Sequence, residues 1–168
     1  MPLLKDGRLV EDPWRVIDDA SPLPASEPAI VSFARFQAER DALLARSAPL
    51  GVTLRNTDAI DALAGAVDRL ELIALEFPKF SDGRAYSQAR GLRERLGFAG
   101  ELRVTGDVLI DQALFMRRCG FDAFEIADAA RAPRFVEAFR TFSVFYQPAG
   151  DGRAPVSALR RFAAAGRA

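Results

Sequence analysis

The sequence contains no histidine and only one cysteine, Cys119. The lack of histidine excludes zinc or haem ligation through imidazole, Ser-His-Asp hydrolysis and proton shuttling by histidine. A single thiol excludes an internal disulfide framework, and it also excludes a self-contained iron–sulfur cluster, which needs several thiolates. The sequence therefore offers no catalytic centre built from histidine or from paired cysteines.

Long apolar runs and a net charge are missing as well. No stretch of about 18 apolar residues is present, and the first residues, "MPLLKDGRLVEDPW", do not have the pattern of a signal peptide. The 23 basic residues balance the 23 acidic ones, so no global field attracts nucleic acid or an acidic membrane. We therefore expect a soluble, cytoplasmic protein that binds neither nucleic acid nor membrane.

Lysine is scarce, because only Lys5 and Lys79 are lysines and all other basic residues are arginines. A GC-rich genome is one explanation for the arginines, but the scarcity also singles out Lys79. The sequence has no Gly-x-Gly-x-x-Gly motif and no P-loop, so it does not predict a dinucleotide cofactor.

The first 28 residues predict an amino-terminal β-hairpin followed by a linker. Apolar residues lie on both sides of Asp6-Gly7, a pair typical of hairpin turns. Prolines at positions 22, 24 and 28 then predict an extended segment, because proline fixes φ and cannot donate a backbone hydrogen bond. We expect an α/β domain over residues 29–150 and a flexible tail over 151–168, with one helical turn near 157–162.

Residues 29–150 alternate between β-branched or apolar runs and amphipathic segments of about ten residues. This pattern predicts an α/β fold with a mostly parallel sheet of about six strands and crossover helices. Six strands are too few for a complete eight-stranded barrel, so an open sheet or a partial barrel is expected. The expected strands are 29–36, 52–57, 71–77, 101–107, 121–126 and 142–147, and the expected helices are 37–47, 58–70, 84–96, 108–120 and 131–141.

Polar residues follow each expected strand, and in a parallel sheet these positions meet at the carboxyl-terminal edge. The sequence therefore predicts a shared polar crevice there. An alternative for the acidic members is that Asp82 and Asp107 only cap helices. The polar residues after the strands are Arg35, Arg55, Asn56, Glu76, Lys79, Asp82, Arg84, Asp107, Asp111, Gln112, Glu125, Tyr146 and Gln147.

The segment "KFSDGR", residues 79–84, is the strongest candidate within this edge. Lys79 and Arg84 flank Asp82 at a helix start, and Gly83 permits close approach of a ligand to the backbone. This arrangement suits an oxyanion. On the helix that follows, Tyr86, Arg90 and Arg93 are expected to share one stripe. They can grip a phosphate, a sulfate or a partner carboxylate, or they can pair with Glu94 or Glu101 as a solvated face.

Two further groups have mainly structural interpretations. Cys119 follows two arginines, but it lies at a helix end where the dipole disfavours a thiolate, so we expect a packed, unreactive side chain. Asp107 and Asp111 lie one turn apart, and acidic residues in a first helical turn are much commoner than metal ligands. No metal site is expected.

The central block, "FPKFSDGRAYSQARGLRERLGFAGELRVTGDVLIDQALFMRRCGFDAF", closely resembles the domain of unknown function 934 family, with weaker resemblance from about residue 52 to 151. The motifs F-P-K-F-x-D-G-R, S-Q-A-R, G-E-L-R, G-D-V, D-Q and R-C-G-F appear in order. The motif positions in this sequence are Lys79, Asp82, Gly83, Arg84, Gln88, Arg90, Asp107, Asp111, Gln112, Arg118 and Cys119.

The resemblance implies a role in assimilatory sulfate reduction, because the family's genes lie beside those for sulfite reductase and phosphoadenylyl-sulfate reductase. Members are labelled oxidoreductases, yet the label identifies no catalytic residue and no mechanism. With one thiol and no haem ligand, electron transfer would need an organic cofactor; none is evident, although a flavin is not excluded. Two hypotheses follow. One is an accessory protein that docks on the sulfite reductase system through the arginine-rich stripe of Arg90 and Arg93. The other is a small enzyme or binding protein for an anionic sulfate, sulfite or phosphate metabolite that uses Lys79, Asp82, Arg84 and Asp107.

Overall fold

The computed structural model describes residues 1–158 and contains one mixed sheet of eight strands in the order β2-β1-β8-β7-β6-β5-β4-β3. Consecutive strands from β3 to β8 pair in parallel, whereas β1 pairs antiparallel with both β2 and β8. The α/β class and the parallel centre are as predicted, but the sheet is larger than expected because the hairpin belongs to it. The strands are β1 Leu3–Lys5, β2 Arg8–Val10, β3 Arg15–Val16, β4 Ala29–Ser32, β5 Leu50–Leu54, β6 Leu72–Phe77, β7 Glu101–Gly106 and β8 Ala123–Glu125.

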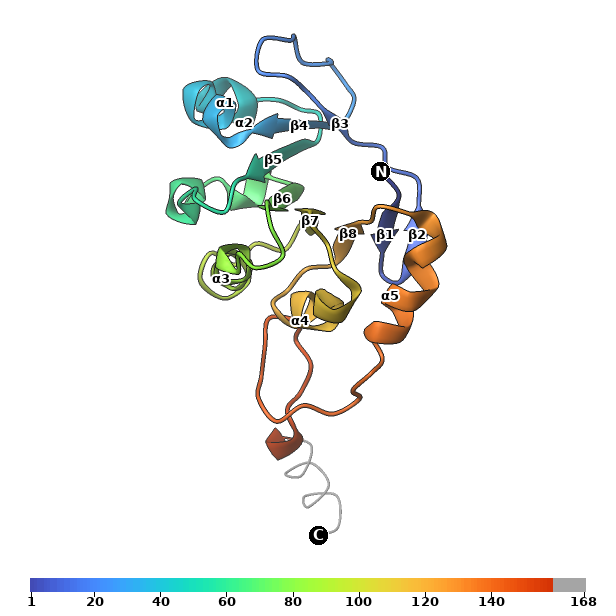
Figure 1. Cartoon of the computed structure of the whole chain (residues 1–168). Helices are drawn as coiled ribbons and strands as arrows, with labels where there is room; N and C mark the ends of the chain where they lie inside the picture. Colours follow the sequence, from blue (N-terminus) through green and yellow to red (C-terminus); the bar gives the residue numbers. More distant parts are fainter. Residues whose placement is uncertain (159–168) are drawn as a thin grey trace.

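The helical segments between the strands are short and lie around the outside of the curved sheet (Figure 1). The α-helices are α1 Phe33–Ala38, α2 Arg40–Leu44, α3 Arg84–Arg90, α4 Ala113–Arg118 and α5 Ala132–Ala138. A π-helical turn, η3, extends α3 over Gly91–Arg95. The remaining turns are 3₁₀-helical: η1 Ile60–Leu63, η2 Val67–Arg69, η4 Ile110–Gln112 and η5 Ala129–Arg131.

The two edges of the sheet are joined by only four residues. Strand β2 ends at Val10 on one edge, and β3 begins at Arg15 on the other. Eight flat strands would separate the edges by about 34 Å, whereas the chain between these two residues spans at most about 19 Å. The sheet must therefore curl, and it forms an open half-barrel. We call residues 11–14, which cross between its two edges, the strap.

Alternation along each strand divides the core in two. On β6, Ile73, Leu75 and Phe77 belong to the main hydrophobic cluster beneath the helices. Leu72 and Ala74 point to the concave face, where they pack with Ile30 and the half-buried Trp14 of the strap. The half-barrel therefore has a large apolar layer outside and a much smaller one inside.

The predicted helix over 58–70 is wrong. The spacing of the buried residues Ile60, Leu63, Val67 and Leu70 is helical, but the segment forms the two separate turns η1 and η2. Gly65, between them, adopts a φ of +73°, which interrupts a right-handed helix. Asp58 does not cap a helix here; its carboxylate accepts a hydrogen bond from the Arg55 amide at 2.7 Å.

The predicted strand over 142–147 is also wrong. The edge of β8 that would receive it is occupied by β1, which pairs Leu4 with Phe124. The segment instead forms an extended arm, residues 142–151, that passes across α4 (Figure 1). The predicted strand over 29–36 also ends earlier, at Ser32, whose hydroxyl accepts the Arg35 amide and caps α1.

Among the described residues, no helix is both long enough and apolar enough to cross a bilayer. Most of the predicted turn at 157–162, and the end of the predicted tail, lie outside the described residues.

Candidate functional site

The five parallel strands β4 to β8 bring their following loops to one edge, as the sequence predicted. Arg35 lies on α1 after β4, Arg55 directly follows β5, Lys79 follows β6, and Asp107 follows β7. Because the strand order runs without reversal from β4 to β8, the sheet has no switch point between two halves. This edge therefore corresponds to the face of an α/β barrel that carries the loops after the strands. Ligands bind on that face, at the carboxyl ends of the strands.

Arg35 has a structural task at this edge. Its guanidinium donates to the carbonyl oxygens of Asp18 and Ser21 at 2.9 and 2.8 Å, and to the Glu39 carboxylate at 3.2 Å. Only 9% of its side chain is exposed. These contacts fix the proline-containing connection between β3 and β4 onto α1.

A hollow of about 540 Å³ lies at the same edge, over the ends of β4 to β6. Ser32, Thr53 and Arg55 contribute to its wall. The charges around it are mostly negative, since four carboxylates accompany the single guanidinium of Arg55. These carboxylates belong to Asp18, Asp19, Asp58 and Glu76.

The loop after β6, residues 78–83, is held from beneath by side chains of the next crossover. The Asp107 carboxylate accepts a hydrogen bond from the Phe80 amide at 2.9 Å. The Gln112 amide donates to the Phe80 carbonyl at 3.1 Å, and its oxygen accepts the Tyr86 hydroxyl at 3.1 Å. Asp107, Tyr86 and Gln112, which the sequence marked as binding candidates, therefore position this loop.

Gly106 makes the contact between this loop and β7 possible. Its φ is +87°, and a β-carbon there would lie 2.3 Å from the Phe77 carbonyl oxygen. The next residue, Asp107, donates its amide to that same oxygen at 2.8 Å. Only glycine fits this close backbone approach, which places the Asp107 carboxylate under the loop.

Asp82 and Arg84 form an ion pair at the helix start. Two of the guanidinium nitrogens donate to the two carboxylate oxygens at 3.0 and 2.6 Å. This pairing, more than any other contact, lowers the pKa of Asp82 to about 2. Gly83 occupies the N-cap position of α3 and has no side chain to cap the helix. The Asp82 carboxylate nevertheless accepts a hydrogen bond from the Arg84 amide at 3.3 Å.

Lys79 and two aromatic rings face solvent on this side of the molecule. Phe80 and Phe115 are 54% and 56% exposed, which is unusual for phenylalanine. Phe115 packs edge-on against Tyr86 at a centroid distance of 4.7 Å, so α3 and α4 are joined by an aromatic contact. Lys79 is exposed and has no ion-pair partner in residues 1–158. We call Lys79, Phe80, Arg84 and Phe115 the loop–helix platform.

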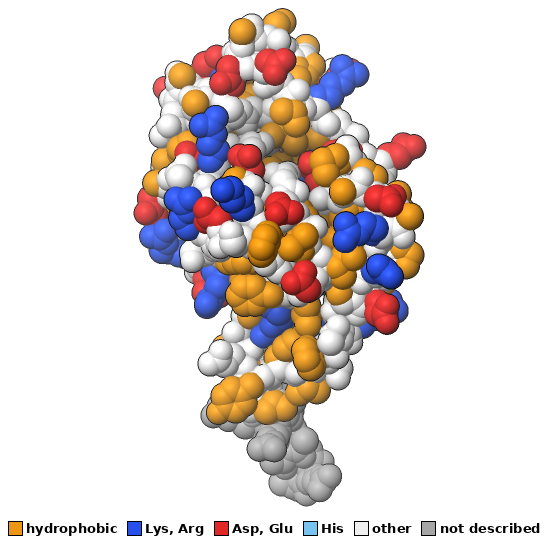
Figure 2. All heavy atoms as spheres, in the orientation of Figure 1, with side chains coloured by type: hydrophobic (Ala, Val, Ile, Leu, Met, Phe, Trp, Pro, Cys, Tyr) orange, Lys and Arg blue, Asp and Glu red, His pale blue; other side chains and the backbone are white. Residues whose placement is uncertain are grey.

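Hydrophobic side chains also gather over α4 and the arm on the face shown in Figure 2. Phe142, Val144 and Tyr146 of the arm are 60%, 52% and 83% exposed. Apolar surface therefore continues from the platform side of the molecule onto the arm.

The stripe expected from Tyr86, Arg90 and Arg93 does not form as one surface. Arg90 is exposed and pairs with Glu94 at 3.1 Å, one of the alternatives that the sequence left open. Arg93 is only 14% exposed and donates to the carbonyls of Phe98, Gly100 and Gly120 as well as to Asp122. The π-helical turn directs Arg93 into the body of the protein, where it joins the connection before β7 to the connection before β8.

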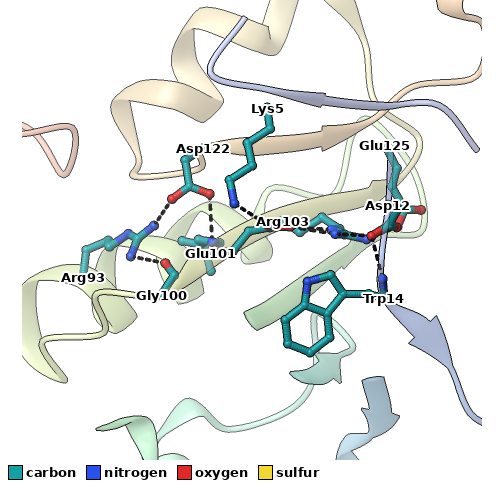
Figure 3. Close-up of polar contacts among 10 residues, drawn as sticks. Lys5, Asp12, Trp14, Arg93, Gly100, Glu101, Arg103, Asp122 and Glu125 are labelled. Atoms are coloured by element: carbon teal, nitrogen blue, oxygen red, sulfur yellow. Dashed lines mark hydrogen bonds and ion pairs between the residues drawn. The ribbon is translucent and has the colours of Figure 1, made fainter. Parts of the chain in front are cut away.

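Two buried polar residues were not singled out as site residues from the sequence. Gln88 donates to the carbonyls of Arg55 and Asp58 at 2.9 and 2.8 Å and so holds the loop after β5. Arg103 is 1% exposed on the concave face (Figure 3), where it contacts Asp12 of the strap, Glu101 and Glu125. The alternation Glu101–Leu102–Arg103 was the available signal, because it places two charges on one strand face.

The Cys119 side chain is packed, as the sequence predicted, whereas only Asp111 of the acidic pair lies in a first helical turn. Cys119 is 3% exposed, and burial raises the pKa of its thiol to about 11. Asp107 is engaged with Phe80, while Asp111 is exposed. Among the described residues, no three carboxylate or thiol groups are arranged to hold a metal ion.

A family model described as "Bacterial protein of unknown function (DUF934)" matches residues 51–157, more than half of the chain. The protein belongs to the DUF934 family. The matched region runs from β5 to the arm and contains the whole platform, whereas the hairpin, the strap and α1 lie before it. No curated protein shows a significant match to the sequence.

Proposed function

We propose that this DUF934 protein is an accessory protein of assimilatory sulfate and sulfite reduction that docks on sulfite reductase through the loop–helix platform. The pathway comes from the gene neighbourhood that the family resemblance implies. The docking mode is supported by one structural observation: the solvent-facing Lys79 and Phe80 stand on a loop whose backbone is fixed by Asp107 and Gln112, and the exposed Phe115 stands on α4.

The composition of the platform fits a protein partner. Aromatic residues and arginine are enriched at interface centres, because they bury a large area and lose little conformational freedom. A loop that is already ordered also loses less entropy on binding than a mobile one. Lys79 and Arg84 would face carboxylates on the partner, since complementary charge steers association.

Binding of a small sulfate or phosphate metabolite at the carboxyl-terminal edge is the second hypothesis, and the charges there favour it less. The hollow over β4 to β6 is lined by four carboxylates and one guanidinium. A doubly charged anion entering it would be repelled by more groups than attract it. Lys79 attracts an anion at this edge more effectively than the hollow does. A carboxylate on a protein partner can be that anion.

The proposal is tested by affinity purification of the tagged protein from sulfate-grown cells, with mass spectrometry of the proteins recovered. We expect sulfite reductase to be enriched with the wild type and to be lost with the double variant Lys79→Glu, Phe80→Asp. Both residues are exposed, so the melting temperature should remain unchanged. The visible spectrum of the same sample tests for a flavin.

The matched control is Arg95→Glu, which reverses an exposed cation paired with Asp61 outside the platform. It should retain sulfite reductase. Retention of the enzyme by the double variant, or its absence from the wild-type sample, would contradict the proposal.

A further inference from the structure

A cavity lies between α3, α4 and the arm, beside the loop–helix platform. Its volume is about 440 Å³, within the range of pockets that hold small organic ligands. The wall is mainly apolar, with Leu114 and Phe115 on α4 and Phe145, Pro148 and Ala149 on the arm. Cys119 contributes its buried side chain to the same wall.

The arm that closes the cavity is fixed in place. Arg118 donates to both carboxylate oxygens of Asp151 at 2.7 and 2.9 Å and to the Gln147 carbonyl at 2.6 Å. Its guanidinium also lies 4.0 Å from the centre of the Phe145 ring. Gly150 packs against the Cys119 carbonyl so closely that a β-carbon would lie 2.9 Å from it. These contacts hold the arm while Phe145 and Ala149 still border open space.

The polar groups at the cavity point to an anionic ligand. Arg118 donates to Asp151 and to the Gln147 carbonyl, which fixes it to the arm, whereas Arg90 keeps one nitrogen for a ligand. The Arg90 side chain is 56% exposed, and its Nε and Nη2 contact Glu94, while Nη1 has no partner within the described part of the chain. Asp111 also lines the cavity, at its boundary with a second hollow that Arg131 and Arg134 line.

We propose that this cavity binds a small molecule with an aromatic or branched apolar body and a single carboxylate or sulfonate group. The apolar body would lie between Phe115 and Phe145, and the anionic group would accept hydrogen bonds from Arg90. An aromatic body suits these two rings, and Nη1 of Arg90 can donate charge-assisted hydrogen bonds to such an acceptor. This inference does not rest on the docking proposal.

Anilinonaphthalene sulfonate is a suitable probe, because it combines an aromatic body with one sulfonate. Titration of the purified protein, followed by fluorescence, should show one bound probe per chain. Arg90→Ala should weaken the affinity about tenfold, the effect of losing a charge-assisted hydrogen bond. Ala149→Phe, which fills the cavity from the arm, should abolish binding.

The control variant is Arg95→Ala. Arg95 and Arg90 are 58% and 56% exposed, and each pairs with one carboxylate, but Arg95 does not line the cavity. Its affinity for the probe should equal that of the wild type. Equal affinity in Arg90→Ala, Ala149→Phe and the wild type would overturn the proposal, as would the absence of saturable binding to the wild type.

Cys119 gives a second measurement, because it is the only cysteine in the sequence. A thiol reagent reaches its sulfur through the cavity, so saturating probe should slow modification of the wild type at least about fivefold. In Arg90→Ala the same probe concentration should protect much less. Modification of the wild type at the same rate with and without probe would place the bound probe elsewhere and overturn the assignment.

Discussion

Arg103 and Asp12 are joined by two hydrogen bonds of 2.6 and 3.0 Å, although 91 residues separate them in the sequence. Arg103 stands on β7 in the middle of the sheet, and Asp12 belongs to the strap that crosses between the sheet edges. Lys5 adds a 2.7 Å contact to Glu101, which also pairs with Arg103 (Figure 3). The concave face is therefore held by a charge network rather than by a large apolar core.

Removal of the central cation should destabilise the fold strongly. Arg103→Met leaves three carboxylates, of Asp12, Glu101 and Glu125, with Lys5 as the remaining cation. We expect a loss of about 3 kcal/mol in the free energy of unfolding, because breaking a buried ion pair leaves uncompensated charge. Urea denaturation measures this loss in the free energy of unfolding.

The comparison for this variant is Arg15→Met, since Arg15 pairs with Glu27 in solvent. It should lose less than about 1 kcal/mol. Equal losses in the two variants would mean that the network contributes no more than a surface ion pair.

Gly106→Ala should both destabilise the protein and weaken docking. The added methyl group meets the Phe77 carbonyl oxygen, and the φ of +87° is unfavourable for alanine. We expect a loss of about 2–3 kcal/mol from the strained backbone and the clash. Because Asp107 moves with Gly106, hydrogen exchange of the Phe80 amide should accelerate beyond the change seen elsewhere. Unchanged exchange at Phe80 would show that Asp107 does not hold the loop.

The Cys119 thiol should react slowly in the folded protein. Burial raises its pKa to about 11, against about 8.5 in an unfolded chain. Alkylation at pH 8 should therefore be at least about a hundredfold faster in denaturant than under native conditions. The folded state binds this proton more tightly, so the free energy of unfolding falls as the pH rises from about 8.5 toward 11. A native alkylation rate close to the denatured one would contradict the burial of the sulfur.

The ion pair at the start of α3 should survive moderate acid. The Arg84 guanidinium lowers the pKa of Asp82 to about 2, so the stabilising contribution is present at neutral pH and is lost as the pH falls through about 2. A carboxylate NMR titration should give a midpoint near 2 in the wild type. In Arg84→Ala the midpoint should move toward 3.8, the ordinary value for this carboxyl. The same midpoint in both proteins would exclude the pairing in solution.

The sequence predicted the parallel centre of the fold because apolar or β-branched runs alternate with amphipathic segments, and the run that forms β6 is almost continuously apolar. It did not predict the half-barrel, since curling depends on the pairing of β1 with β8 and on the length of the strap. The strand expected at 142–147 failed for the same reason: its apolar residues indicate a strand, but the pairing of Leu4 with Phe124 occupies the edge it needs.

The sequence predicted where the candidate site lies better than it predicted the role of each residue in it. Asp107, Tyr86 and Gln112 were selected because they follow strands or share a helix with arginines, and they do meet around Phe80. Their roles depend on which atoms face one another, which spacing along the chain does not specify. Arg93 shows the limit most clearly, because one π-helical turn moved it away from the face that an ideal helix would give it.

The most direct test of the docking account is a binding measurement between purified protein and purified sulfite reductase at increasing salt. The account predicts saturable binding that weakens with salt, because Lys79 and Arg84 face carboxylates on the enzyme. It also predicts that Lys79→Glu, Phe80→Asp abolishes binding while Arg95→Glu leaves it intact. Binding of the double variant with wild-type affinity, or no binding by the folded wild type, would contradict it.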